Sequence, residues 1–123
     1  MKLHKPGFLA LVADAKTRVK EIDITRYREM VEAKTPMVLV DVREDNEWNA
    51  GHASGAVHLG KGIIERDIEA AIPDPATPLV LYCGGGYRSA LAADVLQKMG
   101  YMNVASLDGG WGAYQTAGLP VEK

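Results

Sequence analysis

The sequence lacks several features that would point to particular classes of protein. It has one cysteine among 123 residues, so no disulfide can form within the chain, and its three histidines show no metal-ligand spacing around that cysteine. The 14 basic and 16 acidic residues nearly balance, which gives no reason to expect nucleic acid or a membrane surface as a partner. No apolar run is long enough to span a bilayer. We therefore expect a cytoplasmic protein, with its thiol kept reduced, that uses no metal and no other cofactor.

The first residues are expected to form an extension that is separate from the main domain. An apolar run over residues 8–13 follows two lysines, as in a signal peptide, but the run is short and charged residues follow it directly. Apolar residues at helical spacing, among them Phe8, Leu9, Leu11, Val12, Ala15 and Val19, instead predict an amphipathic helix that begins at Pro6. We predict a helical N-terminal extension over residues 1–19 and one domain over residues 20–123.

Strands are expected to alternate with helices through the rest of the chain. The apolar spacing predicts strands at 37–42, 56–59, 79–82 and 104–107, a turn at 51–55, and helices near 24–34, 44–50, 63–71, 89–99 and 111–117. This alternation predicts an α/β fold with a mostly parallel central sheet and helices on both faces. Ligands in such folds bind beyond the carboxyl ends of the strands, where Asp41, Cys83 and Asp108 are expected to lie.

The only cysteine, Cys83, stands between the expected strand 79–82 and the following helix. Glycines occupy positions 84–86, and they allow the backbone to curl so that successive N–H groups turn inward around an anion. The N-terminus of the helix and the nearby Arg88 add positive charge, so we expect a stabilised and nucleophilic thiolate. The alternative interpretation is a buried structural cysteine beside a glycine turn.

Four segments of the chain, taken in order, resemble motifs of the rhodanese-homology family. They are Asp41-Val42-Arg43-Glu44 with Glu47-Trp48, Gly51-His52-Ala53-Ser54-Gly55-Ala56, Cys83-Gly84-Gly85-Gly86-Tyr87-Arg88-Ser89, and Leu107-Asp108-Gly109-Gly110-Trp111 with Gly118-Leu119-Pro120-Val121. The resemblance covers about residues 20–122, and four motifs in order are far more specific than one. Ala53 and Ser54 replace the isoleucine and proline of the family's turn, which affects its packing rather than the chemistry.

The resemblance implies a rhodanese-like fold and a sulfurtransferase activity. In the family, the cysteine takes a sulfane sulfur from a donor such as thiosulfate, becomes a persulfide, and passes the sulfur to cyanide or another thiol. Such covalent catalysis divides one transfer into two easier steps. Cys83 would then be the catalytic nucleophile, and the substrate-binding residues would be Gly84, Gly85, Gly86, Tyr87, Arg88 and Ser89. The expected partners are a small-molecule donor and acceptor, with a thiol-bearing protein as a further candidate acceptor.

Several residues outside the cysteine loop are candidates for supporting roles. Asp41 is expected either to accept hydrogen bonds from the loop or Arg88, or to cap the end of its strand. Arg43 is expected to form a structural ion pair with Glu47, with a role in substrate binding as the alternative. For the remaining candidates, we expect structural hydrogen bonds from His52 and His58, core positions for Trp48, Trp111 and Tyr114, and a place for Tyr87 at the pocket wall or against a partner protein.

Two other functions remain to be weighed against sulfur transfer. Cysteine-dependent phosphatases and arsenate reductases also hold a cysteine in an anion cradle. Their signature places the arginine one residue further from the cysteine than Arg88 stands from Cys83. A non-catalytic, partner-binding rhodanese module is the other alternative, but inactive members of the family commonly lack the cysteine that is present here. We therefore favour sulfur transfer.

Overall fold

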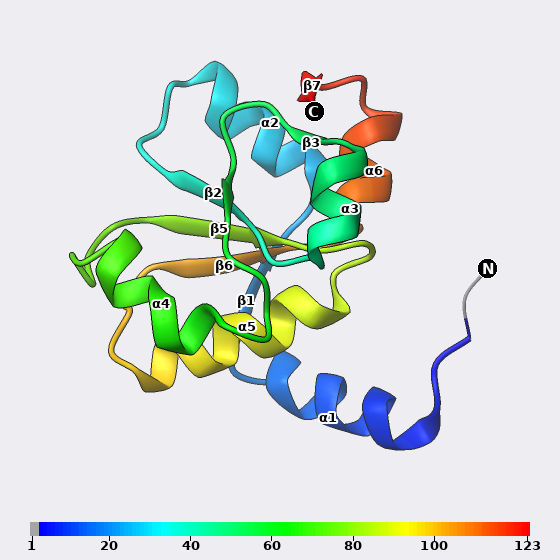
Figure 1. The fold of residues 1–123 in the computed structure, drawn as a ribbon, viewed down its shortest axis with the longest axis vertical. Coiled ribbons are helices and arrows are strands. Elements are labelled where there is room, and N and C mark those ends of the chain that lie inside the picture. Colours follow the sequence, from blue (N-terminus) through cyan, green and yellow to red (C-terminus); the bar gives the residue numbers. More distant parts are fainter. Residues whose placement is uncertain (1–2) are drawn as a thin grey trace.

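The computed structural model describes residues 3–123 and shows an α/β fold (Figure 1). The helices are α1 (Pro6–Lys16), α2 (Ile24–Glu32), α3 (Asp45–Ala50), α4 (Ile64–Ala71), α5 (Tyr87–Lys98) and α6 (Gly110–Thr116), and the strands are β1 (Lys20–Ile22), β2 (Val38–Asp41), β3 (His52–Ala53), β4 (Val57–His58), β5 (Leu79–Tyr82), β6 (Val104–Leu107) and β7 (Val121–Glu122). Within the described residues, five strands form an all-parallel sheet in the order β1-β6-β5-β2-β4. The predicted fold class is therefore confirmed.

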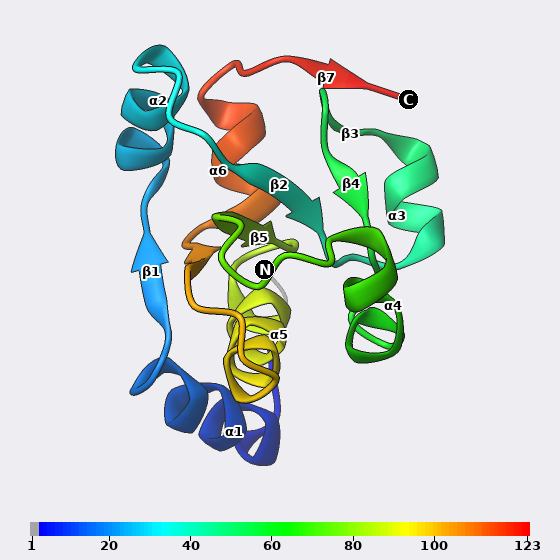
Figure 2. The ribbon, with the colours of Figure 1, turned by 90° about the vertical axis from the view of Figure 1, so that its left-hand side faces the viewer.

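Helices cover both faces of the sheet, and each face has its own hydrophobic core. In Figures 1 and 2, α2 and α6 lie on one side of the sheet, α4 and α5 lie on the other, and α1 packs outside α5. Successive residues of β5 point to opposite faces, so that Leu79 and Leu81 join the core under α4 and α5, whereas Val80 and Tyr82 join the core under α2 and α6. Every residue of β5 is buried, which explains its continuous apolar run.

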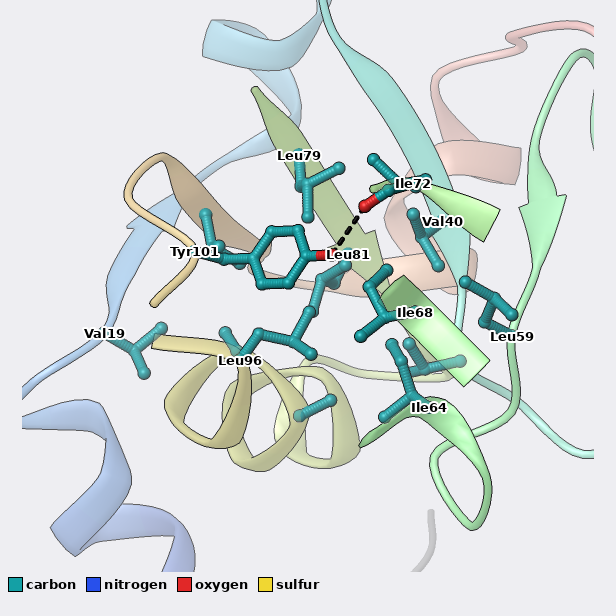
Figure 3. Packing of buried hydrophobic residues seen from close by; sticks show 14 of the residues in the cluster. Val19, Val40, Leu59, Ile64, Ile68, Ile72, Leu79, Leu81, Leu96 and Tyr101 are labelled. Carbon is teal, nitrogen blue, oxygen red and sulfur yellow. Dashed lines mark hydrogen bonds between the residues drawn. The ribbon is translucent and has the colours of Figure 1, made fainter. Parts of the chain in front are cut away.

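The core under α4 and α5 also holds a buried polar group that is satisfied by the backbone. Figure 3 shows Tyr101 among aliphatic side chains of β5, α4 and α5, with its hydroxyl donating to the carbonyl oxygen of Ile72 at 2.5 Å. Ile72 follows the last residue of α4, where helix carbonyls have no partner within the helix. This bond therefore fixes the end of α4 against the sheet.

Several short elements differ from the sequence predictions. The turn expected at 51–55 contains β3, which pairs antiparallel with β7, and neither β7 nor the short strand β1 was predicted. These strands have two or three residues each, and pairing between distant segments leaves no local pattern in the sequence. Helix α5 begins at Tyr87 rather than near Ser89, because Gly86 takes a left-handed conformation (φ = 104°) and acts as the N-cap.

The N-terminal helix begins at Pro6, as the sequence predicts, but its apolar face is narrower than expected. Val12 and Ala15 are buried against Leu91 of α5. Leu9 and Leu11 were expected on the same face, and the structure shows this to be wrong, since they are 42% and 57% exposed. No helix among residues 3–123 has both the length and the apolar character needed to cross a membrane.

The parallel sheet brings the expected site residues to one edge. Asp41 ends β2 and is in register with Tyr82, the last residue of β5, so that Cys83 follows at the same level. Ser106 of β6 is in register with Leu81 on the other side of β5. Carboxyl ends of parallel strands form the edge at which ligands bind in α/β folds. The strand ends thus place Cys83 between β2 and β6.

Candidate active site

The sulfur of Cys83 occupies the position of a helix-capping side chain. Cys83 directly follows β5 and is 1% exposed, and its Sγ accepts hydrogen bonds from the backbone N–H groups of Gly86 at 3.1 Å and Ser89 at 3.4 Å. Gly86, the N-cap of α5, has no side chain that could accept from the first turn of the helix. The sulfur therefore satisfies amides that would otherwise lack a partner.

The carbonyl groups of the cysteine loop are held by the first turn of α6. The N–H of Trp111 donates to the carbonyl oxygen of Cys83 at 2.7 Å, and the N–H of Gly112 donates to that of Gly84 at 3.3 Å. A Cβ atom at Gly110 (φ = 48°) would collide with the carbonyl groups of both Cys83 and Gly84. Glycine at this position therefore allows α6 to fix the loop at close range.

A pair of buried hydroxyl groups lies behind the sulfur. Ser89 Oγ is 3.5 Å from Cys83 Sγ and 2.7 Å from Ser106 Oγ, and both serines are fully buried. Ser89 was predicted from its place in the loop, whereas Ser106 was missed. The available signal was a single hydroxyl residue inside an otherwise apolar strand. The two hydroxyls orient each other and leave the sulfur with a polar neighbour on its buried side.

Arg88 is not a free cation, because it forms a two-point ion pair with Glu47 of α3. Its guanidinium donates to the two carboxylate oxygens of Glu47 at 2.7 and 3.2 Å. The prediction that Glu47 pairs with Arg43 is therefore wrong. The hydrogen bond from Arg88 outweighs the effect of burial and lowers the pKa of Glu47 to about 2. Because this pKa is depressed, the ion pair stabilises the fold fully at pH values above the ordinary glutamate pKa. That stabilisation is lost as the pH falls from there through about 2.

If the site takes an anionic sulfur donor, as the resemblance to the rhodanese-homology family implies, Glu47→Gln is expected to improve the use of that donor. Glutamine keeps an oxygen that accepts from Arg88 but removes the charge that neutralises it, so the KM for thiosulfate should fall by roughly threefold. Initial rates with thiosulfate and with an uncharged organic polysulfane measure the effect, and the uncharged donor should be unaffected. Arg88→Ala is the matched variant and should raise the KM for thiosulfate alone. Equal changes with both donors would mean that the pair shapes the loop and does not bind charge.

Asp41 and Arg43 form a buried ion pair beside the cysteine loop. Asp41 accepts from the guanidinium of Arg43 at 2.8 Å, from the backbone N–H of Arg43 at 2.9 Å, and from the hydroxyl of Tyr82 at 2.6 Å. Of the two roles expected for Asp41, the structure shows the cap at the end of the strand. No hydrogen bond within residues 3–123 joins it to Arg88 or to the N–H groups of residues 84–89.

Arg43 is charged and enclosed by aromatic rings. Its guanidinium carbon lies 4.5 Å from the ring centre of Trp111 and 5.5 Å from that of Tyr82, and its Nη2 donates to the carbonyl oxygen of Gly51 at 2.7 Å. Burial is the largest single effect on Arg43 and disfavours the charged guanidinium, but the hydrogen bonds and the negative charge of Asp41, together with smaller contributions from Tyr82, raise its pKa. Arg43 thus connects β2 to the Gly51 turn and to α6.

The two histidines near the site make structural hydrogen bonds, as predicted. A ring nitrogen of His52 lies 3.0 Å from the carbonyl oxygen of Trp48, and a ring nitrogen of His58 lies 2.9 Å from that of Arg43. The indole of Trp48 stacks on His52 with ring centres 3.4 Å apart. Tyr114 is buried as expected, whereas Trp48 and Trp111 are only half-buried.

A pocket of about 880 Å³ lies over the cysteine loop. It is lined by His4, Phe8, Glu44, Asn46, Glu47, Cys83, Gly84, Gly85, Tyr87 and Arg88. Tyr87 therefore contributes to the pocket wall, one of the two places predicted for it. His4 and Phe8 were missed as site residues, because nothing in the sequence indicates that the N-terminal segment folds back over residue 83. The pocket thus combines a buried thiol with aromatic and acidic lining residues.

Comparison with known protein families finds a match over most of the chain. The model of the rhodanese-like domain matches residues 23–117. Thiosulfate sulfurtransferase GlpE of Shewanella oneidensis is 37% identical over 98 residues, which cover 80% of this chain and 94% of that protein. tRNA uridine(34) hydroxylase of Chlamydia caviae is 36% identical over 110 residues, which cover 85% of this chain but only 33% of that protein. The similarity to the sulfurtransferase therefore extends over nearly its whole length.

Solved structures show the same fold. Protein RPA3614 of Rhodopseudomonas palustris is described as a protein of unknown function and a possible tyrosine phosphatase. Its structure matches with a TM-score of 0.84 and 30% identity, and the match covers 99% of this chain and 98% of that one. A thiosulfate sulfurtransferase from Pseudomonas aeruginosa has a TM-score of 0.75 and 30% identity, covering 85% of this chain and 20% of that one. The two descriptions name different reactions, phosphate hydrolysis and sulfur transfer, and the two reactions need cysteine loops of different size.

Proposed function

This chain belongs to the rhodanese family, and on that premise we propose that it moves a sulfane sulfur from thiosulfate or a persulfide donor to a thiophilic acceptor through a persulfide on Cys83. Thiosulfate sulfurtransferase is the activity named for curated relatives that match it over nearly their full length. The chain is accordingly an enzyme of the sulfurtransferase class. A nucleophile that works as a free thiol suits a reducing compartment such as the cytoplasm.

The proposal is carried by the two backbone N–H groups that donate hydrogen bonds to the sulfur of Cys83. In the first step, the thiolate attacks the outer sulfur of thiosulfate, a new S–S bond forms at Sγ, and the S–S bond of thiosulfate breaks with its electron pair leaving on sulfite. The N–H groups of Gly86 and Ser89 stabilise the attacking thiolate. The first turn of α5 has further N–H groups without helical partners, at Tyr87 and Arg88, for the negative charge of the persulfide.

In the second step the acceptor takes the outer sulfur of the persulfide. Its nucleophilic atom, the carbon of cyanide or the sulfur of a thiolate, forms a bond to that sulfur, and the bond to Sγ breaks with its electron pair returning to Cys83. The products are thiocyanate or an organic persulfide, together with the free thiolate. Because the same amides hold Sγ before and after transfer, the leaving thiolate is stabilised without rearrangement of the loop.

Loop size argues against phosphatase chemistry, despite the description of the structural relative as a possible tyrosine phosphatase. Arg88 is five residues after Cys83, one fewer than in the phosphatase signature, and its guanidinium is engaged by Glu47. Two amides of the loop already bind Sγ itself. A cradle of this size suits one additional sulfur atom on the thiolate better than a bound tetrahedral oxyanion.

The proposal is tested by treating the purified protein with thiosulfate and measuring its intact mass. We expect a mass increase of one sulfur atom that maps to Cys83 and is removed by cyanide, with release of thiocyanate. Hydrolysis of an aryl phosphate, measured on the same preparation, should be negligible. Efficient phosphate release without a sulfur adduct would favour the phosphatase alternative, and neither activity would favour a non-catalytic binding module.

A further inference from the structure

The pocket over Cys83 has a wall that comes from outside the family-matched residues 23–117. The ring of His4 lies 5.0 Å from that of Phe8 and 4.9 Å from that of Tyr87, and Phe8 and Tyr87 are 6.2 Å apart, so the three rings form one cluster. The segment that carries His4 and Phe8 is fixed by α1, whose Val12 and Ala15 pack on α5. His4 and Phe8 therefore add two rings from outside the family-matched residues to Tyr87, which lies within them.

Another part of the pocket lining is acidic. Glu44, Asn46 and Glu47 line it from the start of α3, together with Arg88. Arg88 neutralises Glu47, whereas the carboxylate of Glu44 accepts from the backbone N–H of Glu47 in a capping box. Two carboxylates therefore face one guanidinium, which leaves this side with an excess of negative charge. An anionic acceptor is disfavoured by that charge and by the negative charge of the Cys83 persulfide that it must approach.

The volume of the pocket exceeds the needs of the simplest substrates. A space of about 880 Å³ lies within the range of about 300–1,000 Å³ that holds organic ligands of drug-like size. Cyanide and thiosulfate would each occupy a small part of it. An aromatic wall contributes nothing to binding such small anions, but it contributes apolar contact area to a larger organic molecule.

We infer that the acceptor is an organic thiol whose apolar body lies against His4, Phe8 and Tyr87 and, apart from the reacting sulfur, carries no negative charge. This inference rests on the proposed function and names the acceptor class of that site. The acceptor thiolate attacks the outer sulfur of the Cys83 persulfide, an S–S bond forms in the acceptor, and the bond to Sγ breaks to return the thiolate. Phe8 and His4 are then specificity-determining residues, and Glu44 selects against anionic thiols.

The test compares acceptors with thiosulfate as the common donor and sulfite release as the common readout. The acceptors are cyanide, 2-mercaptoethanol, benzyl thiol, and benzyl thiols that carry an aminomethyl or a carboxylate substituent. In the wild type, kcat/KM for benzyl thiol should exceed that for 2-mercaptoethanol by about tenfold, and the aminomethyl compound should be preferred over the carboxylate. This comparison needs no variant and therefore does not depend on how a substitution affects folding.

Phe8→Ala should lower kcat/KM for benzyl thiol by about tenfold and change that for cyanide by less than about twofold. Leu11→Ala is the matched control, since Leu11 lies on the same helix but is exposed and does not line the pocket. Glu44→Gln should reduce the preference for the aminomethyl over the carboxylate compound. Normal cyanide turnover without these differences would overturn this inference alone, whereas absence of sulfite release with every acceptor would overturn the proposed function and the inference with it.

Discussion

Cys83→Ser is expected to reduce sulfur transfer by roughly a thousandfold or more while the protein stays folded. A serine hydroxyl is not ionised at neutral pH and cannot carry a transferable sulfur, so neither half of the reaction can proceed. It can still accept the hydrogen bonds that the N–H groups of Gly86 and Ser89 now give to Sγ. Sulfite release measures the loss of activity, and urea unfolding should show a change in stability of about 1 kcal/mol or less.

Cys83→Ala provides the matched control for this result. Alanine is equally unable to accept sulfur, but it also leaves the amides of Gly86 and Ser89 without the acceptor that caps α5. It should therefore be less stable than the serine variant by about 0.5–2 kcal/mol. Turnover in the serine variant at the wild-type rate would exclude Cys83 as the nucleophile, and equal stability of the two variants would exclude the capping role of the sulfur.

The parts of the site that the sequence predicts are those whose cause is local. An apolar run, a cysteine, three glycines and a helical repeat follow one another directly, so the strand, loop and helix around Cys83 are specified within one short segment. The parallel sheet follows from the alternation of strands and helices along the chain. Asp41 and Cys83 each stand at the carboxyl end of a strand, so parallel pairing of the strands is enough to place both at one edge of the sheet.

The parts that could not be predicted depend on partners far apart in the chain. Two arginines and two carboxylates near the site could form ion pairs in more than one way. The observed pairs, Arg43 with Asp41 and Arg88 with Glu47, depend on which arginine is buried against aromatic rings and which lines the pocket. The N-terminal segment reaches the pocket through packing of α1 on α5, whose apolar residues indicate a buried face but not the surface it contacts. Spacing within one segment cannot decide either question.

Asp41→Ala is expected to lower the free energy of unfolding by about 3–5 kcal/mol. The carboxylate of Asp41 is fully buried and is the anion that balances the guanidinium of Arg43, which is 3% exposed. Its removal leaves a buried charge without a counterion and takes an acceptor from the hydroxyl of Tyr82. Urea unfolding of the variant and the wild type measures this change in free energy. The two m-values must be equal, because a changed m-value would mean that the unfolded state or the two-state character of unfolding had changed as well.

The double variant Asp41→Leu with Arg43→Met separates the cost of an unpaired charge from the value of the pair. Replacing both partners by apolar side chains of similar size should be less destabilising than removing Asp41 alone, because no buried charge remains. Sulfite release per folded molecule should stay within about twofold of the wild type in the Asp41→Ala variant, since within residues 3–123 the carboxylate of Asp41 accepts hydrogen bonds from Arg43 and Tyr82 and from no residue of the cysteine loop. A large fall in kcat under conditions where the variant is fully folded would instead show that this ion pair supports the chemistry at Cys83. A double variant as unstable as the single one would show that the hydrogen bond from Arg43 to Gly51, and not the balance of charge, dominates the contribution of Arg43 to stability.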